Sequence, residues 1–196
     1  AAAIRFPSSF ENSIIDGCTF SNNTNSTYSD YNSQEVITFR GYTYYGGDNT
    51  QSLLVTNCNF LDNGAYNSRE SLVVYDLNTK FDNCHFSNNY GSDLSLEGND
   101  YYYSPVNFEI QYCTFEQTTD IDFDDDGHSL FIKLNWLYDS SLTINHTTFD
   151  LAGNHWYDSY NFMYIDDSYG SQLNIDACQF NENNESRDYP SMFAQY

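Results

Sequence analysis

The most specific chemical signal in the chain is an acidic loop. Asp122, Asp124 and Asp126 alternate with other residues, and Gly127 follows directly. Calcium-binding loops often begin with this pattern, because three carboxylates converge on the ion and the glycine permits the sharp turn. The Glu expected at about the twelfth position of a complete EF-hand loop is Lys133 instead. The sequence therefore predicts a simpler Ca²⁺ loop, with a solvated acidic loop as the alternative.

Aromatic side chains form the second group of candidate binding residues. They gather in the longer segments between repeats, where a ridge of rings would suit sugar faces or a protein partner. The alternative is that these segments bury their own rings. The residues are Tyr42, Tyr44, Tyr45, Tyr101, Tyr102, Tyr103, Trp136 and Trp156.

Signals for catalysis or a redox centre are weaker. The chain has 28 Asp plus Glu residues, but no spacing singles out a pair for acid/base chemistry. The five cysteines include no C-x-x-C motif, and the four histidines share no spacing, which argues against a zinc site. The net charge of −22 repels phosphate backbones and anionic lipids, so no nucleic-acid partner is expected.

Four Asn-x-Ser/Thr sequons indicate a secreted glycoprotein. Their acceptors are Asn22, Asn25, Asn145 and Asn184, and a glycan requires an exposed position on a secreted chain. No apolar stretch is long enough to span a membrane as a helix. We expect an extracellular or cell-surface location, without a membrane span.

A short phrase repeats six times along the chain and predicts its architecture. The phrase is an apolar residue, two further residues, Cys, one residue, Phe, two residues and Asn. Such repeats mark a stack of similar coils that bury their apolar faces only against one another. The six copies are Ile15–Cys18–Phe20–Asn23, Val55–Cys58–Phe60–Asn63, Phe81–Cys84–Phe86–Asn89, Ile110–Cys113–Phe115, Ile144–Thr147–Phe149 and Ile175–Cys178–Phe180–Asn183.

Each coil is predicted to contain three short strands. An apolar run such as 36–39 or 72–75 precedes each phrase and reads as a strand. Apolar residues five and three places before the Cys alternate as on one strand face, but the Cys itself has the opposite parity. The chain must therefore bend just before the Cys, where Gly17, Asn57 and Asn83 tolerate a left-handed conformation.

The shared repeat position of the cysteines predicts an interior column. There they would act mainly as small apolar residues. A disulfide between neighbouring coils is also compatible with the spacing of about 4.8 Å between adjacent strands. The sequence leaves this choice open.

Three strands per coil with Cys, Phe and Asn columns resemble the right-handed parallel β-helix, or pectin-lyase-like, superfamily. Within it, the C-x-F-x-x-N phrase is most similar to repeats of adhesin-like and protist surface proteins. The resemblance implies an all-β, right-handed parallel β-helix of about six coils, which we expect to form a single domain over residues 1–196. It specifies the architecture more closely than the activity, because the superfamily includes both enzymes and structural fibres.

The function predicted from these features is structural. We expect a non-catalytic extracellular building block of a filament, coat or adhesive surface, which is a segment of a longer chain or associates through its coil ends. The runs 4–6 and 192–194 resemble the first strand of a repeat, and open coil ends display unpaired backbone groups. The alternative is a carbohydrate-active or glycan-binding β-helix.

Overall fold

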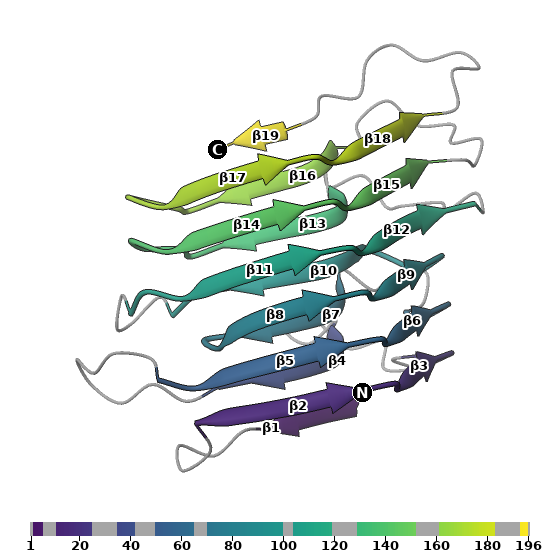
Figure 1. Ribbon diagram of the computed structural model, residues 1–196, viewed down its shortest axis with the longest axis horizontal. Coiled ribbons are helices and arrows are strands. Elements are labelled where there is room, and N and C mark those ends of the chain that lie inside the picture. The colour runs from purple at the N-terminus through teal and green to yellow at the C-terminus, as the bar shows by residue number, and fades with distance from the viewer. Residues whose placement is uncertain are drawn as a thin grey trace, which may run out of the picture.

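The computed structural model describes residues 2–5, 11–24, 35–41, 50–64, 70–99, 104–118, 129–151, 161–182 and 193–195. These residues form strands and turns without a helix. The strands stack into a parallel β-helix of six coils with three strands each, as the sequence predicts (Figure 1). The N-terminal coil lies at the bottom of the view and the C-terminal coil at the top.

Three parallel sheets form the walls of the β-helix. The first contains β1 (Ala2–Arg5), β4 (Glu35–Arg40), β7 (Glu70–Tyr75), β10 (Ser92–Glu97), β13 (Ser129–Asn135), β16 (Asn161–Asp166) and β19 (Phe193–Gln195). The second contains β2 (Asn12–Asp16), β5 (Ser52–Thr56), β8 (Asn78–Asp82), β11 (Asn107–Gln111), β14 (Ser141–Asn145) and β17 (Gln172–Asp176). The third contains β3 (Thr19–Ser21), β6 (Asn59–Leu61), β9 (His85–Ser87), β12 (Thr114–Gln117), β15 (Thr148–Leu151) and β18 (Gln179–Glu182).

Equivalent residues of successive coils face one another in register. In the third sheet, Phe20 pairs with Phe60 and Phe60 with Phe86. The ring centroids of consecutive members of this column lie between 4.5 and 5.0 Å apart, and the rings are nearly parallel. The column of six phenylalanines is confirmed, and it runs through every coil: Phe20, Phe60, Phe86, Phe115, Phe149 and Phe180.

The predicted bend before the Cys position is present in all six coils. The bend residues are Gly17, Asn57, Asn83, Tyr112, His146 and Ala177, and each has a positive φ between 48° and 64°. Tyr112 and Ala177 are of residue types that seldom adopt this conformation, so the bend does not depend on glycine or asparagine.

A side-chain hydrogen bond accompanies each bend. The thiol of Cys58 donates to the carbonyl oxygen of Thr56 at 3.1 Å, and the hydroxyl of Thr147 donates to Asn145 in the same way at 3.0 Å. The other four cysteines make the equivalent contact. A small side chain that can donate a hydrogen bond satisfies this position, which explains why Thr147 replaces cysteine in the fifth coil.

The six Cys or Thr positions form the predicted interior column. Backbone hydrogen bonds of 2.9 to 3.0 Å link each member to the next coil. Cys58, Cys84, Cys113 and Thr147 are buried, whereas Cys18 is exposed and Cys178 half-buried. All five cysteines are free thiols.

The phenylalanine column supplies a direct test of coil stacking. Phe86 is fully buried between the rings of Phe60 and Phe115. Replacing Phe86 with alanine should lower the free energy of unfolding by about 3–5 kcal/mol, because burial is lost and a cavity forms. Phe20→Ala should cost clearly less, since Phe20 is half-exposed on the first coil. Equilibrium urea unfolding measures both variants, and equal costs would contradict the account.

Candidate functional site

Most of the predicted binding residues lie outside the described part of the chain. This holds for the acidic loop, for seven of the eight aromatic residues and for two sequon acceptors. The residues concerned are Asp122, Asp124, Asp126, Tyr42, Tyr44, Tyr45, Tyr101, Tyr102, Tyr103, Trp156, Asn25 and Asn184. Among the described residues, no group of three or more His, Cys, Asp or Glu side chains is placed to hold a metal ion.

Trp136, the described member of the aromatic group, occupies a coil corner. It follows β13 with a φ of 54° and is half-buried. Its carbonyl oxygen lies so close to Gly98 of the preceding coil that a Cβ there would approach it to 2.1 Å. The close packing of this corner therefore requires glycine at position 98. The backbone of Trp136 therefore has a structural role in this corner.

Two sequon acceptors lie on the described surface in different settings. Asn22 is exposed in the turn after β3, with a φ of 54°. Asn145 lies at the end of β14 and is half-buried, and the hydroxyl of its sequon partner Thr147 is buried and bonded to the Asn145 carbonyl. Asn22 is thus the more open of these two acceptors.

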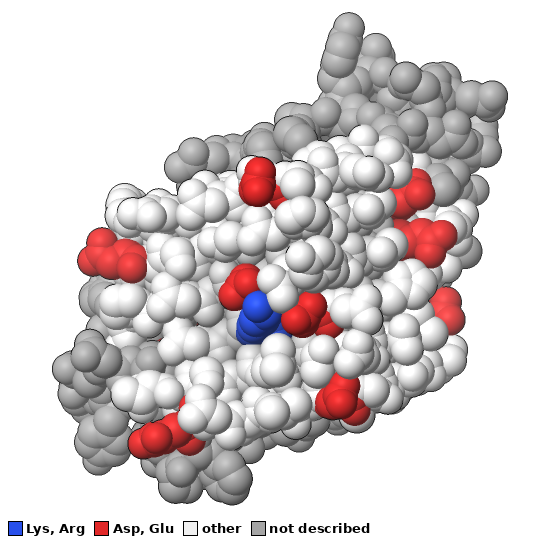
Figure 2. Space-filling model, viewed as in Figure 1, with Lys and Arg blue, Asp and Glu red and all other residues white. Residues whose placement is uncertain are grey.

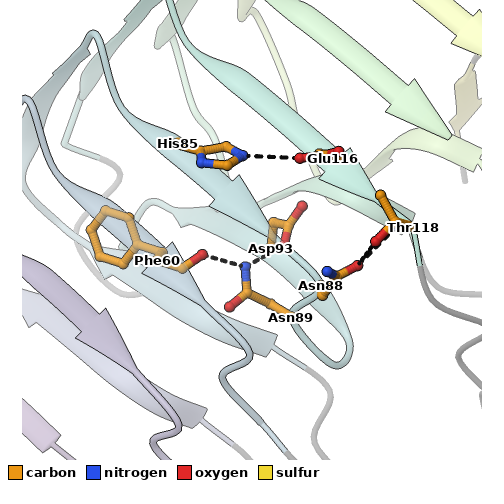
Figure 3. Close-up of polar contacts among 7 residues, drawn as sticks. All are labelled: Phe60, His85, Asn88, Asn89, Asp93, Glu116 and Thr118. Carbon is orange, nitrogen blue, oxygen red and sulfur yellow. Dashed lines mark hydrogen bonds and ion pairs between the residues drawn. The ribbon is translucent and has the colours of Figure 1, made fainter. Parts of the chain in front are cut away.

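Polar pairs link neighbouring coils on the outer faces. Lys80 contacts Glu109 at 2.9 Å on the second sheet, and His85 contacts Glu116 at 3.2 Å on the third (Figure 3). These side chains are 34 to 40% exposed, so each pair contributes little to stability. The face that carries the second sheet shows one basic area among scattered acidic ones (Figure 2). On this face, acidic side chains are therefore scattered and basic ones are confined to a single area.

The asparagine column of the repeat forms a hydrogen-bonded ladder inside the turns. The side-chain oxygen of Asn63 accepts from the backbone and side-chain nitrogens of Asn23, at 3.1 and 2.9 Å. Asn89 accepts from Asn63 in the same way, at 3.0 and 2.9 Å. Asn63 and Asn89 also donate to the Phe carbonyls of the preceding coils. These hydrogen bonds explain why asparagine occupies this repeat position in the first three coils.

The ladder ends at Asp93, a residue that sequence reasoning missed. The fourth coil has Thr118 in place of the asparagine, and Thr118 binds Asn88 instead (Figure 3). The side-chain nitrogen of Asn89 donates to Asp93 Oδ1 at 2.7 Å. The loss of asparagine in the fourth phrase, with an aspartate shortly after Asn89, is the sequence signal that marks this end.

The Asp93 carboxyl is an unusual buried acid. It is 1% exposed, and its second oxygen, Oδ2, has no hydrogen-bond partner among the described residues. Desolvation raises the pKa of Asp93 well above its usual range, although the hydrogen bond from Asn89 opposes the shift. Burial therefore favours the neutral carboxyl at this point of the core.

Stability should depend on pH through Asp93. The unfolded state releases this proton near pH 4, whereas the native state retains it to a higher pH. The free energy of unfolding therefore falls as pH rises from about 4 through the raised native pKa, by up to about 1.4 kcal/mol per pH unit. Asp93→Asn should remove the contribution of this carboxyl to the pH dependence of the free energy of unfolding.

Denaturant unfolding of wild type and variant across this pH range measures the difference. Asp62→Asn is the matched control, because Asp62 is exposed and asparagine tolerates its φ of 52°. The stability of the Asp93 variant relative to wild type should improve as pH rises, while that of the control stays flat. Parallel curves for all three proteins would show that Asp93 titrates normally.

The two ends of the coil stack expose the core. At the N-terminal end, Ile15 and Phe20 are half-buried and Cys18 is exposed. At the C-terminal end, Leu173 is 37% exposed, and Ile175, Cys178 and Phe180 are half-buried. Equivalent positions in the internal coils are at most 3% exposed. Among the described residues, β2, β3, β17 and β18 each pair on one side only, and their outer edges are flanked by these apolar residues.

Both ends present the same columns in the same order. β2 pairs with β5, and β17 with β14, through equivalent residues, so Ile15 and Ile175 occupy one column. Cys18 and Cys178 share the second column, and Phe20 and Phe180 the third. We refer to these two surfaces as the N-terminal end and the C-terminal end. Both carry the Ile, Cys and Phe positions of an internal coil boundary, while at the C-terminal end β19 already pairs with β16.

Comparison with known proteins finds no matching family model, curated protein or solved structure. No helix in the described part of the chain is long and apolar enough to cross a membrane. The function must therefore be argued from the geometry of the stack itself.

Proposed function

We propose that this protein is a non-catalytic structural element, a β-helical building block of a filament, coat or adhesive surface, whose stack is continued through its coil ends by a second copy or by further coils of a longer chain. The observation that carries the proposal is that the core columns run in register through all six described coils. Leu173, Ile175 and Phe180 of the last of these coils continue the columns and are more exposed than their equivalents in the internal coils.

The internal coil contacts indicate how the ends would join. Within the chain, each boundary forms parallel strand pairs, a phenylalanine stack and a Cys or Thr column. A C-terminal end that meets the N-terminal end of a second copy can repeat these contacts, because both carry the same three columns. The contact is heterologous and does not close on itself, so it generates a filament.

Location and modification complete the proposal. The four sequons and the exposed acceptor Asn22 support an extracellular or cell-surface glycoprotein. The described fold is a parallel β-helix, as the resemblance implies, and the similarity to adhesin-like and protist surface proteins stays a prediction. Binding of Ca²⁺ at Asp122, Asp124 and Asp126 is a separate prediction, as is glycan contact by the aromatic segments.

A charge at the C-terminal end should prevent association. Leu173→Lys places an ammonium group where a second copy would cover it, and burying an unpaired charge costs several kcal/mol. The protein concentration needed for assembly should rise at least about 10-fold, since each 1.4 kcal/mol changes an equilibrium tenfold. Sedimentation velocity over a concentration series measures this value.

Ile14→Lys is the matched control for Leu173→Lys. Ile14 is a similar apolar residue, 69% exposed, but it lies on the outer face of β2 rather than in a core column. This variant should assemble as the wild type does. Equal effects of both lysines, or a wild type that is monomeric and cleaves a polysaccharide, would favour the enzyme alternative.

Glycosylation provides an independent check on location. Protein secreted from eukaryotic cells should lose mass on treatment with an amidase that removes N-linked glycans. Asn22→Gln should remove one glycan from the intact mass, because Asn22 is exposed in a turn. Asn145→Gln serves as the comparison at a half-buried strand position. An unchanged mass for the untreated and treated wild type would refute the glycoprotein assignment.

A further inference from the structure

Cys84 and Cys113 face each other across an internal boundary of the stack, between the third and fourth coils. Both residues belong to the Cys column, and each is 2% exposed. The backbone nitrogen of Cys84 donates to Cys113 Sγ at 3.4 Å, and the backbone nitrogen of Thr114 donates to the Cys84 carbonyl at 3.0 Å. In the structure both cysteines are free thiols. Two reduced sulfurs are therefore held in neighbouring coils inside the core.

The bends give these two cysteines the same orientation. Each follows a bend residue of nearly the same conformation, Asn83 with a φ of 54° and Tyr112 with a φ of 53°. The flanking strands pair in register, β8 with β11 before the bend and β9 with β12 after it. Neighbouring parallel strands lie about 4.8 Å apart, within the range of about 4.4–6.8 Å between the two Cα atoms of a disulfide. The backbone thus already has the spacing that a bond between the two sulfurs requires.

Side-chain contacts on the outer faces hold this boundary on both sides of the thiols. Before the bend, the side-chain nitrogen of Gln111 donates to Asp82 Oδ2 at 2.8 Å. After the bend, His85 contacts Glu116 at 3.2 Å (Figure 3). These contacts oppose sliding of the fourth coil over the third, so they keep Cys84 and Cys113 at the same level.

The contacts of Cys84 favour Cys113 as its partner over Cys58, its neighbour in the second coil. A hydrogen bond from the Cys113 thiol lowers the pKa of Cys84 and so favours the thiolate, the reactive form in disulfide exchange. Burial raises the pKa of Cys58, and Cys84 acts on Cys58 only through its charge. On its other side Cys113 meets Thr147, whose neighbour Thr148 donates to the Cys113 carbonyl. Cys84 is therefore the adjacent cysteine for Cys113 in the described column.

We propose that Cys84 and Cys113 form a disulfide bond when the protein folds under oxidising conditions, and that this bond staples the third coil to the fourth. The inference goes beyond the proposed assembly and holds or fails independently of it. Oxidising conditions are those of the proposed extracellular location. The bond joins residues 29 positions apart and restricts the unfolded chain accordingly. It would add a covalent link to a stack that is otherwise held by non-covalent contacts.

A small disulfide such as oxidised glutathione is the oxidant in this reaction. The Cys84 thiolate attacks one glutathione sulfur, the sulfur–sulfur bond of the oxidant breaks, and one glutathione thiolate leaves. Cys113 then gives its proton to solvent, attacks the Cys84 sulfur and expels the second glutathione. The two cysteines lose two electrons, and the oxidant gains them. Because both thiols are buried in the folded chain, the exchange takes place during folding, before the coils close.

Oxidative refolding followed by a tryptic map tests the bond. The full chain is reduced, unfolded and refolded with oxidised and reduced glutathione or with reduced glutathione alone, and free thiols are then blocked with iodoacetamide in denaturant. Trypsin cleaves after Lys and Arg, so Cys84 and Cys113 share the fragment 81–133. Cys58 lies in the fragment 41–69. The oxidised sample should yield 81–133 unblocked and lighter by the two thiol hydrogens, whereas the reduced sample should yield it doubly blocked.

Two threonine variants provide matched controls, because Thr147 shows that threonine fits this column. Cys113→Thr should leave Cys84 open to blocking, whereas Cys58→Thr should leave the oxidised fragment unchanged. The melting temperature of oxidised wild type should exceed that of the reduced protein by at least about 5 °C. Cys113→Thr should lose this difference, and Cys58→Thr should keep it. Protein secreted from eukaryotic cells, mapped without refolding, provides a second measurement.

Two results would overturn the inference. One is a doubly blocked fragment 81–133 from oxidatively refolded and secreted protein, both with a cooperative melting transition that shows they are folded. The other is a cross-link between the fragments 41–69 and 81–133 in the wild type, which would show that Cys84 pairs with Cys58. Neither result bears on end-to-end assembly, which the Leu173→Lys variant tests separately.

Discussion

In-register stacking of identical columns is the constraint on which the rest of the structure depends. A single coil cannot bury its own core, so each phenylalanine, thiol or asparagine of a column is covered by its equivalents in the adjacent coils. The phenylalanine column, with centroid spacings of 4.5 to 5.0 Å, follows from this arrangement. A one-residue slip would turn every inward side chain outward. The bends with positive φ hold the register, because they fix where each strand begins.

Because of this stacking, the outermost described coils are covered by another coil on one side only. The negative net charge of the chain opposes the addition of a second copy there. A copy with a net charge of −22 repels its neighbour. Asp16 and Asp176 occupy one outer column, so they would meet at a head-to-tail junction. Like charges directly opposite each other on a sheet are destabilising. Ionic strength should therefore favour assembly by screening this contact.

The sequence predicted the architecture well because the repeat positions carry the fold directly. The parity break at Cys58 required a bend, and the bend residues Tyr112 and Ala177 show that stacking imposes the conformation even on poorly suited residue types. The burial of Asp93 could not be predicted, since it arises only where Thr118 interrupts the asparagine ladder. The run 192–194, predicted to resemble the first strand of a repeat, overlaps β19 (Phe193–Gln195). The acidic loop and the aromatic residues other than Trp136 lie outside the described residues, and their roles stay predictions.

The central claim is that coil stacking continues from one copy to the next. A cryo-electron microscopy map of the assembled protein at side-chain resolution tests it most directly. The account predicts unbroken columns across each junction, with Phe20 of one copy stacked on Phe180 of its neighbour at the spacing of about 4.8 Å seen between adjacent strands. Single particles with uncovered ends, or copies joined through their outer faces, would contradict it.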